Sequence, residues 1–325
     1  MIKMFNMKNE YPIGKVEILL GWVCNNNCMF CSVGHKLAER KIKKWETVKK
    51  HIDYGKKVKA ETISFSGGEP TIINYLEEAV KYAKKLGFRT IEIQSNGRMF
   101  SYPEFAKKIV EAGANRFLIS IHADNPELGD AMNRVRGSFE QTVKGIRNLK
   151  KLGVENLRFS VVINKLNYKR LNEIMEFLLN FEPIGIHVNY TIIDGHAYTY
   201  RESIMPPKMS DVAPYVHEAI NRIKNAGKEI WIYSFPYCLM KGYEFAIAEK
   251  GNFDSRLIGP DFNVSLQENR HKHRIKSESC KKCRYYNVCL GPWKRYARIF
   301  GFEEFKPIEG EMIEESKLIS QGYKI

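Results

Sequence analysis

The sequence predicts an α/β fold, a partial (β/α)6 TIM-like barrel with a small cysteine-rich C-terminal extension. Short strand-like runs alternate with amphipathic helices in six successive units, which favours parallel strands joined by right-handed crossovers. Polar and glycine-rich segments follow the ends of these runs, where such folds collect functional groups. After about residue 235 the alternation stops, and three cysteines lie between residues 280 and 289.

Each expected strand is a short run of β-branched and other apolar residues, and each expected helix repeats apolar residues at intervals of three and four. The first strand leads into a cysteine-rich loop, the second ends in SGGEP and the third ends in SNG. The second helix stops at Gly87, a residue type common just after helices. In chain order, the expected strands are residues 16–20, 61–65, 89–94, 116–121, 156–163, 184–190 and 228–234, and the expected helices are residues 45–57, 75–87, 102–112, 138–153, 168–180 and about 210–226.

Length and composition limit the class of protein. With 325 residues, 44% of them hydrophobic, the chain can form one large domain and a smaller one. No apolar run approaches the roughly 18 residues of a membrane span, and the first residues are too charged for a signal peptide. The expected location is therefore the cytoplasm, without a membrane partner. Seven cysteines in such a chain favour metal or redox use over a disulfide framework.

The chain carries a formal charge of +15. A basic excess can indicate a nucleic acid partner. The lysine runs are short, however, and they are spread through the chain. Solvated helix faces rich in lysine are the simpler interpretation, and nucleic acid binding stays open.

The loop after the first strand contains Cys24, Cys28 and Cys31 in the segment CNNNCMFC. A structural zinc site takes four ligands, and no fourth cysteine lies near these three in the sequence. A 4Fe–4S cluster usually takes four cysteines, so three leave one iron open to another ligand. Taken alone, the three cysteines also fit a redox site, and the GGEP segment also fits a simple turn.

Together, the segments CNNNCMFC and GGEP (67–70), each at the end of an expected strand, resemble the signatures of the radical S-adenosylmethionine (SAM) superfamily. The resemblance extends from residue 12 to about residue 235. It implies an enzyme that reductively cleaves SAM to a 5′-deoxyadenosyl radical, which abstracts hydrogen from a substrate. It further implies a 4Fe–4S cluster with three cysteine ligands and an electron donor such as ferredoxin or flavodoxin.

The resemblance also implies roles for individual residues. The three cysteines would bind three irons, and the amine and carboxylate of SAM would bind the fourth. Glu69 would accept a hydrogen bond from the SAM amine, while no catalytic side chain is assigned. The residues expected to contact SAM are Phe30, Gly67, Gly68, Glu69, Pro70, Asn96, Ser120, His122 and Arg134. Structural roles stay open for several of them, because core aromatics, strand-end polar residues and surface arginines are common.

A second cysteine group lies near the C-terminus, in the segment ESCKKCRYYNVCLGPW. Its cysteines are Cys280, Cys283 and Cys289, and Cys238 is a plausible fourth ligand. The spacing is similar to the SPASM and twitch extensions of radical SAM enzymes, although Trp293 stands where the full SPASM pattern has another cysteine. The resemblance implies one auxiliary 4Fe–4S cluster, and a zinc site with four thiolates is the alternative. The expected segments are residues 1–235 (barrel), 236–305 (auxiliary-cluster region) and 306–325 (C-terminal tail).

The substrate is the open part of the prediction. Relatives with auxiliary clusters mostly modify peptides or proteins, so the resemblance implies a radical SAM oxidoreductase or modifying enzyme that acts on a peptide or protein. A nucleoside, tRNA or small metabolite is the alternative substrate, although the terminal segment QGYKI lacks the Gly-Gly of the molybdopterin-precursor cyclase. A non-catalytic iron–sulfur electron carrier is the alternative from another class. The GGEP segment disfavours it, since a carrier needs no site for the SAM amine.

Overall fold

The computed structural model of the chain describes residues 12–249 and 254–314. Within them, one nine-stranded sheet has the order β7-β6-β5-β4-β3-β2-β1-β8-β9. All neighbouring strands are parallel except the antiparallel pair β8–β9. The strands are β1 (Ile13–Leu19), β2 (Thr62–Ser66), β3 (Thr90–Ser95), β4 (Arg116–Ser120), β5 (Leu157–Ile163), β6 (Gly185–Tyr190), β7 (Glu229–Tyr233), β8 (Asp254–Ile258) and β9 (Asn263–Ser265).

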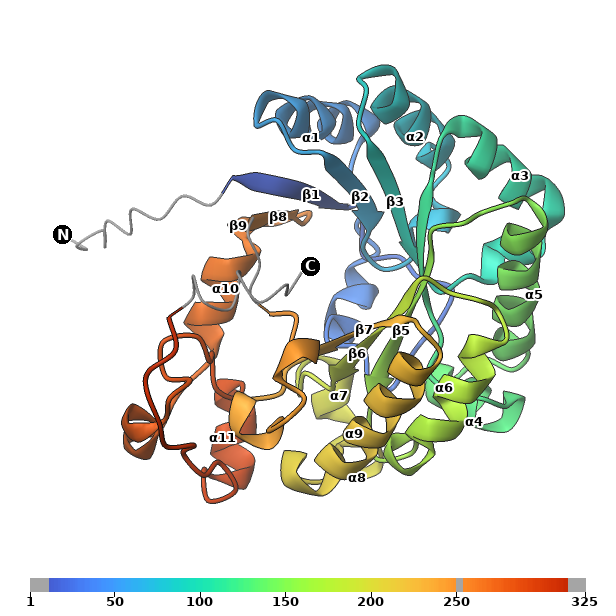
Figure 1. Cartoon of the computed structure of the whole chain (residues 1–325). Helices are drawn as coiled ribbons and strands as arrows, with labels where there is room; N and C mark the ends of the chain where they lie inside the picture. Colours follow the sequence, from blue (N-terminus) through green and yellow to red (C-terminus); the bar gives the residue numbers. More distant parts are fainter. Residues whose placement is uncertain (1–11, 250–253, 315–325) are drawn as a thin grey trace.

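The sheet curls into an open barrel, and the helices cover its outer face (Figure 1). The C-terminal region lies beside the open side, between β8–β9 and β7 (Figure 1). The α-helices are α1 (Trp45–Lys57), α2 (Leu76–Lys85), α3 (Pro103–Ala112), α4 (Pro126–Asn133), α5 (Ser138–Lys151), α6 (Leu171–Leu179), α7 (His196–Thr199), α8 (Arg201–Ile204), α9 (Met209–Asn225), α10 (Leu266–His273) and α11 (Lys294–Phe300). The predicted α/β class and partial barrel are confirmed, including the seven parallel strands β1–β7.

Residues alternate along each barrel strand between two environments. In β5, Leu157, Phe159 and Val161 are fully buried beneath the helices, whereas Arg158 and Ser160 are only half-buried. Because successive side chains of a strand point to opposite faces, the half-buried set lines the barrel interior. The apolar core therefore lies between sheet and helices, and the interior is polar.

The C-terminal region, where the sequence shows no further alternation of strands and helices, still contains both kinds of element. The strands β8 and β9 extend the barrel sheet along the edge of β1, and α10 and α11 follow them. The segment LQENRHKH of α10 has no buried residue, so it lacks the apolar periodicity by which a helix is predicted. The sheet thus continues past residue 235, where the sequence suggested a boundary; the three-segment division stays a prediction. Residues 315–325 of the expected tail lie outside the described ranges.

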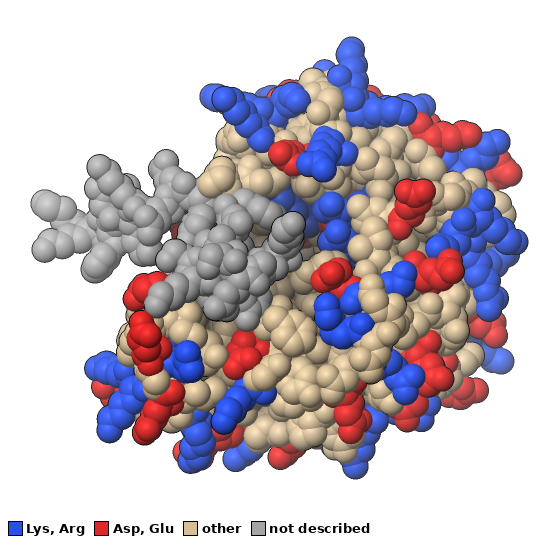
Figure 2. Space-filling model, viewed as in Figure 1, with Lys and Arg blue, Asp and Glu red and all other residues tan. Residues whose placement is uncertain are grey.

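Basic residues are distributed over much of the surface. On the face in Figure 2, lysine and arginine side chains are numerous around the rim, with acidic side chains between them. Among the residues that the structure describes, no helix has both the length and the apolar character of a membrane span.

Candidate functional site

The loop that follows β1 carries Cys24, Cys28 and Cys31, all with free, half-buried thiols. The backbone N–H of Asn26 donates to the sulfur of Cys24 over 3.3 Å, and the Cys28 thiol lies 3.4 Å from Oδ1 of Asn133. One short loop therefore presents the three predicted ligands together.

Burial governs the ionisation of these thiols. It raises the pKa of Cys24 to about 12, against a smaller opposing effect of the Arg98 cation. Burial, followed by the neighbouring thiols, also raises the pKa of Cys28, and burial raises that of Cys31. The loop by itself thus favours neutral thiols, and a bound metal centre would have to supply the positive charge that makes them thiolates.

The two glycines of GGEP bring the end of β2 against this loop. A Cβ at Gly68 would lie 2.1 Å from the carbonyl oxygen of Val23, and one at Gly67 would lie 2.7 Å from that of Gly21. Gly67 also has a φ of +130°, which favours glycine. The backbone N–H of Gly68 donates to Gly21 O over 2.9 Å, so the close approach in this structure is to the backbone that precedes Cys24.

Glu69 connects the ends of β2 and β3. Its side chain is 2% exposed. Oε1 accepts hydrogen bonds from the backbone N–H and hydroxyl of Thr71 and from the hydroxyl of Ser95, and Oε2 accepts one from the backbone N–H of Asn96. Burial raises the pKa of Glu69, and these four donors oppose that effect. Pro70 opens the short turn that follows.

Asn96 and Arg98, just after β3, hold the cysteine loop from the other side. The Asn96 side chain donates to Oδ1 of Asn25 over 2.6 Å. Arg98 donates to the carbonyl oxygen of Asn25 and, over 2.9 Å, to Oδ1 of Asn26. Asn96 was among the predicted site residues. Arg98 was missed, although its position directly after the SNG segment is the same strand-end signal.

Phe30 belongs to a small apolar cluster with Met132 and Ile204, and the His122 ring contacts Phe30. The two rings meet edge to face with centroids 4.5 Å apart. His122 is 8% exposed, its Nδ1 accepts the backbone N–H of Val162, and burial lowers its pKa to about 3. His122 is therefore neutral and carries its proton on Nε2.

Ser120 and Arg134, the last two predicted SAM contacts, lie in different environments. Ser120 ends β4 on the interior face that Arg116 shares. Arg134 is exposed, and its guanidinium stacks 4.8 Å from the ring centroid of Tyr200. It stands one residue after Asn133, whose carbonyl oxygen accepts from the N–H of Asn27, so it flanks the cysteine loop.

The segment after β6 covers the cysteine loop, and the sequence analysis did not include it. The backbone N–H of His196 donates to Cys31 O over 2.9 Å, and Nδ1 of its ring lies 3.2 Å from Cys28 O. Gly34 fits against that ring, since a Cβ there would lie 2.1 Å from it. His196 opens α7, in the segment that follows the end of β6, and that place after a strand end is the signal that could have found it.

The residues present fit a cluster with one open iron. Three free thiols share a loop, a buried carboxylate lies at the next strand end, and polar side chains follow β3 and β4. This donor set suits a soft metal centre beside a ligand that carries an amine.

The comparison with known families agrees with this geometry. Residues 19–178 match the radical SAM superfamily. The chain contains a radical SAM domain. A probable GTP 3′,8-cyclase of Saccharolobus islandicus (strain L.S.2.15 / Lassen #1) is 27% identical over 177 residues, which are 54% of this chain and 56% of the relative. The chain therefore matches little more than half the length of this curated relative.

Two solved structures resemble the radical SAM domain and the region beyond it. Streptococcus suis SuiB bound to precursor peptide SuiA has a TM-score of 0.66 and 14% identity over 94% of this chain and 76% of SuiB. Native anSMEcpe with bound AdoMet has a TM-score of 0.63 and 15% identity over 94% of this chain and 95% of anSMEcpe. At these identities the likeness concerns the fold.

The other four cysteines lie beside the radical SAM domain and line one cavity, together with Lys276, Tyr286 and Pro307. They are Cys238, Cys280, Cys283 and Cys289. Burial raises the pKa of Cys238, and the three other thiols add to that effect. Backbone N–H groups of Gly291 and Ile308 donate to the sulfurs of Cys289 and Cys283 over 3.3 and 3.4 Å. Within the described residues, no three Cys, His, Asp or Glu side chains are arranged to bind a single metal ion.

A buried ion pair joins this cysteine region to the radical SAM domain. Arg274 contacts Glu249, and their side chains are 1% and 7% exposed. Glu249 also accepts the backbone N–H of Ser234, just after β7, and Arg274 stacks 4.1 Å from the ring centroid of Trp293. The cysteine cavity is thereby fixed to the end of the last barrel strand.

Proposed function

We propose that the chain is an enzyme that uses a 4Fe–4S cluster on Cys24, Cys28 and Cys31 to cleave SAM reductively. The observation that carries the proposal is the loop of three free thiols, fixed by strand ends within a radical SAM domain. When bound, the cluster supplies the electron for cleavage, which yields methionine and a 5′-deoxyadenosyl radical. A non-catalytic electron carrier is less well supported, because it has no use for a site for the SAM amine, which Glu69 offers beside the cysteine loop.

The protein residues orient the loop and SAM. Arg98 and Asn96 hold the loop backbone, and His196 covers it. Oε2 of Glu69 accepts one bond in the described structure, which leaves a lone pair for the SAM amine. Phe30 offers an apolar surface for the adenine. The predicted SAM contacts of Gly67, Gly68, Pro70, Ser120, His122 and Arg134 are part of this proposal.

The cavity of the second cysteine group would hold one auxiliary 4Fe–4S cluster, in an extension of the SPASM or twitch kind. Four thiols around one cavity and two N–H donors to sulfur support this assignment. With Cys238 as the fourth ligand, every iron would have a cysteine, and the cluster would serve electron transfer rather than substrate binding. Zinc on the same thiols would make the region a structural clasp.

The proposed substrate is a peptide or protein. SuiB was solved with a precursor peptide, and the likeness to it extends over the C-terminal region as well as the barrel. A nucleotide is the second candidate, because the curated relatives are named as probable GTP 3′,8-cyclases. A peptide modification that oxidises its target would be an oxidoreductase reaction, and a nucleotide cyclisation would be closer to a lyase reaction. Ferredoxin or flavodoxin is the proposed electron donor.

The test is anaerobic reconstitution followed by incubation with SAM and dithionite. Release of 5′-deoxyadenosine is expected, and its absence in iron-replete protein would contradict the proposal. Adding GTP, or a peptide encoded beside the gene, separates the two substrates. The true substrate should be consumed and should increase the rate of deoxyadenosine release.

A further inference from the structure

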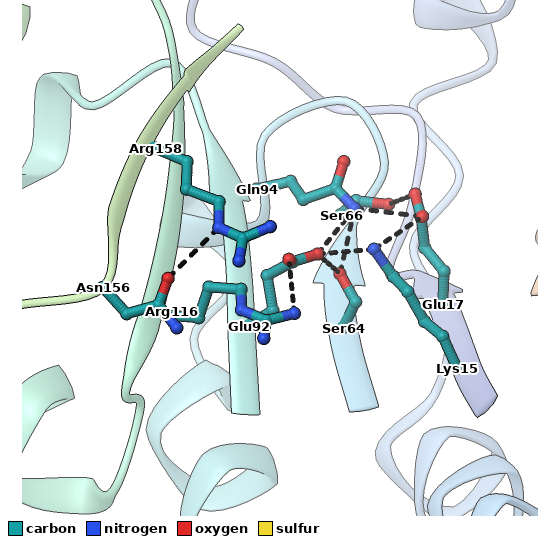
Figure 3. Close-up of polar contacts among 9 residues, drawn as sticks. All are labelled: Lys15, Glu17, Ser64, Ser66, Glu92, Gln94, Arg116, Asn156 and Arg158. Carbon is teal, nitrogen blue, oxygen red and sulfur yellow. Dashed lines mark hydrogen bonds and ion pairs between the residues drawn. The ribbon is translucent and has the colours of Figure 1, made fainter. Parts of the chain in front are cut away.

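The interior of the barrel contains a cluster of charged side chains that the SAM site does not use. In Figure 3 these side chains extend from β1, β2, β3, β4 and β5 toward one another. Lys15, Glu17 and Arg116 are 19%, 18% and 22% exposed, whereas their strand neighbours Val16 and Phe117 are fully buried. Solvent therefore reaches these charges in part, whereas the side chains on the helix-covered face of the same strands are sealed from it.

On one wall of this interior, the polar and charged side chains are paired with one another. On β1–β3, Lys15 lies 2.5 Å from Glu92, and Gln94 donates to both Glu92 and Glu17 over 3.0 Å (Figure 3). Ser64 and Ser66 donate to the same two carboxylates. The acidic groups of the β1–β3 wall thus have several donors each, and they offer little to a further ligand.

The opposite wall, on β4–β6, has donors without acceptors. Arg158 donates from Nε to Asn156 over 3.2 Å, and its terminal nitrogens have no hydrogen-bond or ion-pair partner among the described residues. Arg116 has one long contact, 3.7 Å to Glu92, and its buried Nε is unpaired within the same residues. Nε2 of His187 is likewise buried without a described partner.

Like charges meet on this wall. Burial and then the Arg116 cation lower the pKa of Arg158, and burial with Arg158 lowers that of His187 to about 3. Among the side chains drawn in Figure 3, three cations face two carboxylates that already have several donors, and Glu229 at the start of β7 has the smallest of the effects that oppose the lowering of the Arg158 pKa. Aromatic rings fix the donors: Arg158 stacks 4.8 Å from the centroid of Trp231, and His187 stacks on Tyr233. Such a fixed excess of positive donors is the complement of an anion.

We propose that the β4–β6 wall of the barrel interior binds an anionic group of the substrate, a carboxylate or a phosphate, through Arg116, Arg158 and His187. The inference rests on the proposed function, because it assigns a binding site to the end of that enzyme's substrate that lies away from the reacting atoms. A planar guanidinium binds either anion with two parallel hydrogen bonds, and neutral His187 adds one donor. The reacting part of the substrate would then extend toward Ser120 and the ends of the strands.

The test uses anaerobically reconstituted protein and isothermal titration calorimetry with inorganic phosphate, pyrophosphate, acetate and succinate at millimolar concentrations. At least one anion is expected to bind. Binding of phosphate or pyrophosphate would indicate a phosphate site, and binding of acetate or succinate would indicate a carboxylate site. Arg158→Gln and His187→Phe, which keeps the ring stacking, should each weaken binding about tenfold or more. Arg158→Lys should have an intermediate effect. The exposed Arg89→Gln is the matched control and should bind like the wild type.

Two results would overturn the proposal: no binding by any of the four anions, or binding that all three variants at positions 158 and 187 leave unchanged. The second result would make the cluster a structural closure of the barrel, and a lowered melting temperature in Arg158→Gln alone would fit that role. Deoxyadenosine release without substrate is measured on the same samples. This release requires SAM but not the anion. If it persists while no anion binds, the anion site is refuted and the proposed SAM chemistry is not.

Discussion

The backbone N–H of Asn96 donates a 2.7 Å hydrogen bond to Oε2 of Glu69, so the end of β3 fixes a carboxylate that follows β2. Both strand ends also contact the cysteine loop, through Gly68 on one side and the Asn96 side chain on the other. Hydrogen bonds therefore connect the Glu69 carboxylate to the loop that carries the three thiols, and substitutions among these residues give the sharpest tests of the proposals.

Replacing any one of Cys24, Cys28 or Cys31 by alanine should abolish release of 5′-deoxyadenosine. The reason is that the remaining thiols cannot hold a cluster in which a single iron is open to SAM. Iron content and deoxyadenosine are measured after anaerobic reconstitution. Ser32→Ala, beside the third cysteine, should keep both. Full activity in any of the three cysteine variants would refute the radical SAM assignment.

Glu69→Ala should weaken SAM binding by about 1–3 kcal/mol, the scale of one lost charged hydrogen bond. It should also lower stability, because the donors of Thr71, Ser95 and Asn96 lose their buried acceptor. Glu69→Gln keeps an acceptor oxygen and removes the charge, so it separates the two effects. Calorimetry gives the SAM affinity, and denaturant unfolding gives the stability. Unchanged SAM affinity in both variants would show that GGEP is only a turn here.

Arg98→Ala should release the cysteine loop from β3 and reduce the retention of iron in the first cluster. The expected loss of stability is about 1.5–3 kcal/mol, because hydrogen bonds from a charged donor to Asn25 and Asn26 disappear. Iron content is followed during dialysis. Arg89→Ala, an exposed arginine just before the start of β3, serves as the control. Equal iron retention in both variants would mean that Arg98 does not hold the loop.

The Glu92 carboxylate should make the free energy of unfolding depend on pH in the acid range. Burial alone would raise its pKa, but Lys15 and Arg116 lower it from the ordinary 4.5 to about 2. A folded-state pKa below the unfolded one contributes stability above pH 4.5, and that contribution is lost as the pH falls toward 2. The loss should approach about 3 kcal/mol, and denaturant unfolding between these pH values measures it. Glu92→Gln should flatten the slope; an equally steep slope in that variant would assign the acid sensitivity to other groups.

The Cys280→Ala, Cys283→Ala double variant should lose about half of the roughly eight irons expected from two clusters. It should also expose residues 236–305 to protease while the barrel stays folded, because metal ligation stabilises small modules. The Cys24/Cys28/Cys31 triple alanine variant is the complementary control and should keep the other half. Elemental analysis reports both metals. One zinc in place of four irons would make the C-terminal region a structural clasp, and redox-neutral chemistry would become the better proposal.

Local patterns in the sequence were enough to predict the barrel and to single out the first cysteine group as a candidate site. The helix expected at residues 45–57 is α1 with the same bounds, because its apolar spacing and its burial against β1 agree. Cys24, Cys28 and Cys31 lie within eight positions, and Glu69 follows a strand by three residues. Such signals can be read without tertiary information, because the carboxyl ends of parallel strands lie at the same edge of the sheet.

The tertiary structure alone decided which distant residues surround that group. Arg98 reaches Asn25 across 73 positions, and His196 reaches Cys28 across 168. The pairing of β8 with β1, and the unpaired donors of Arg158 and His187 in the barrel interior, likewise depend on how strands far apart in the chain are brought together. No local periodicity encodes these contacts, because each of them arises from the curvature of the sheet and the packing around it rather than from neighbouring residues.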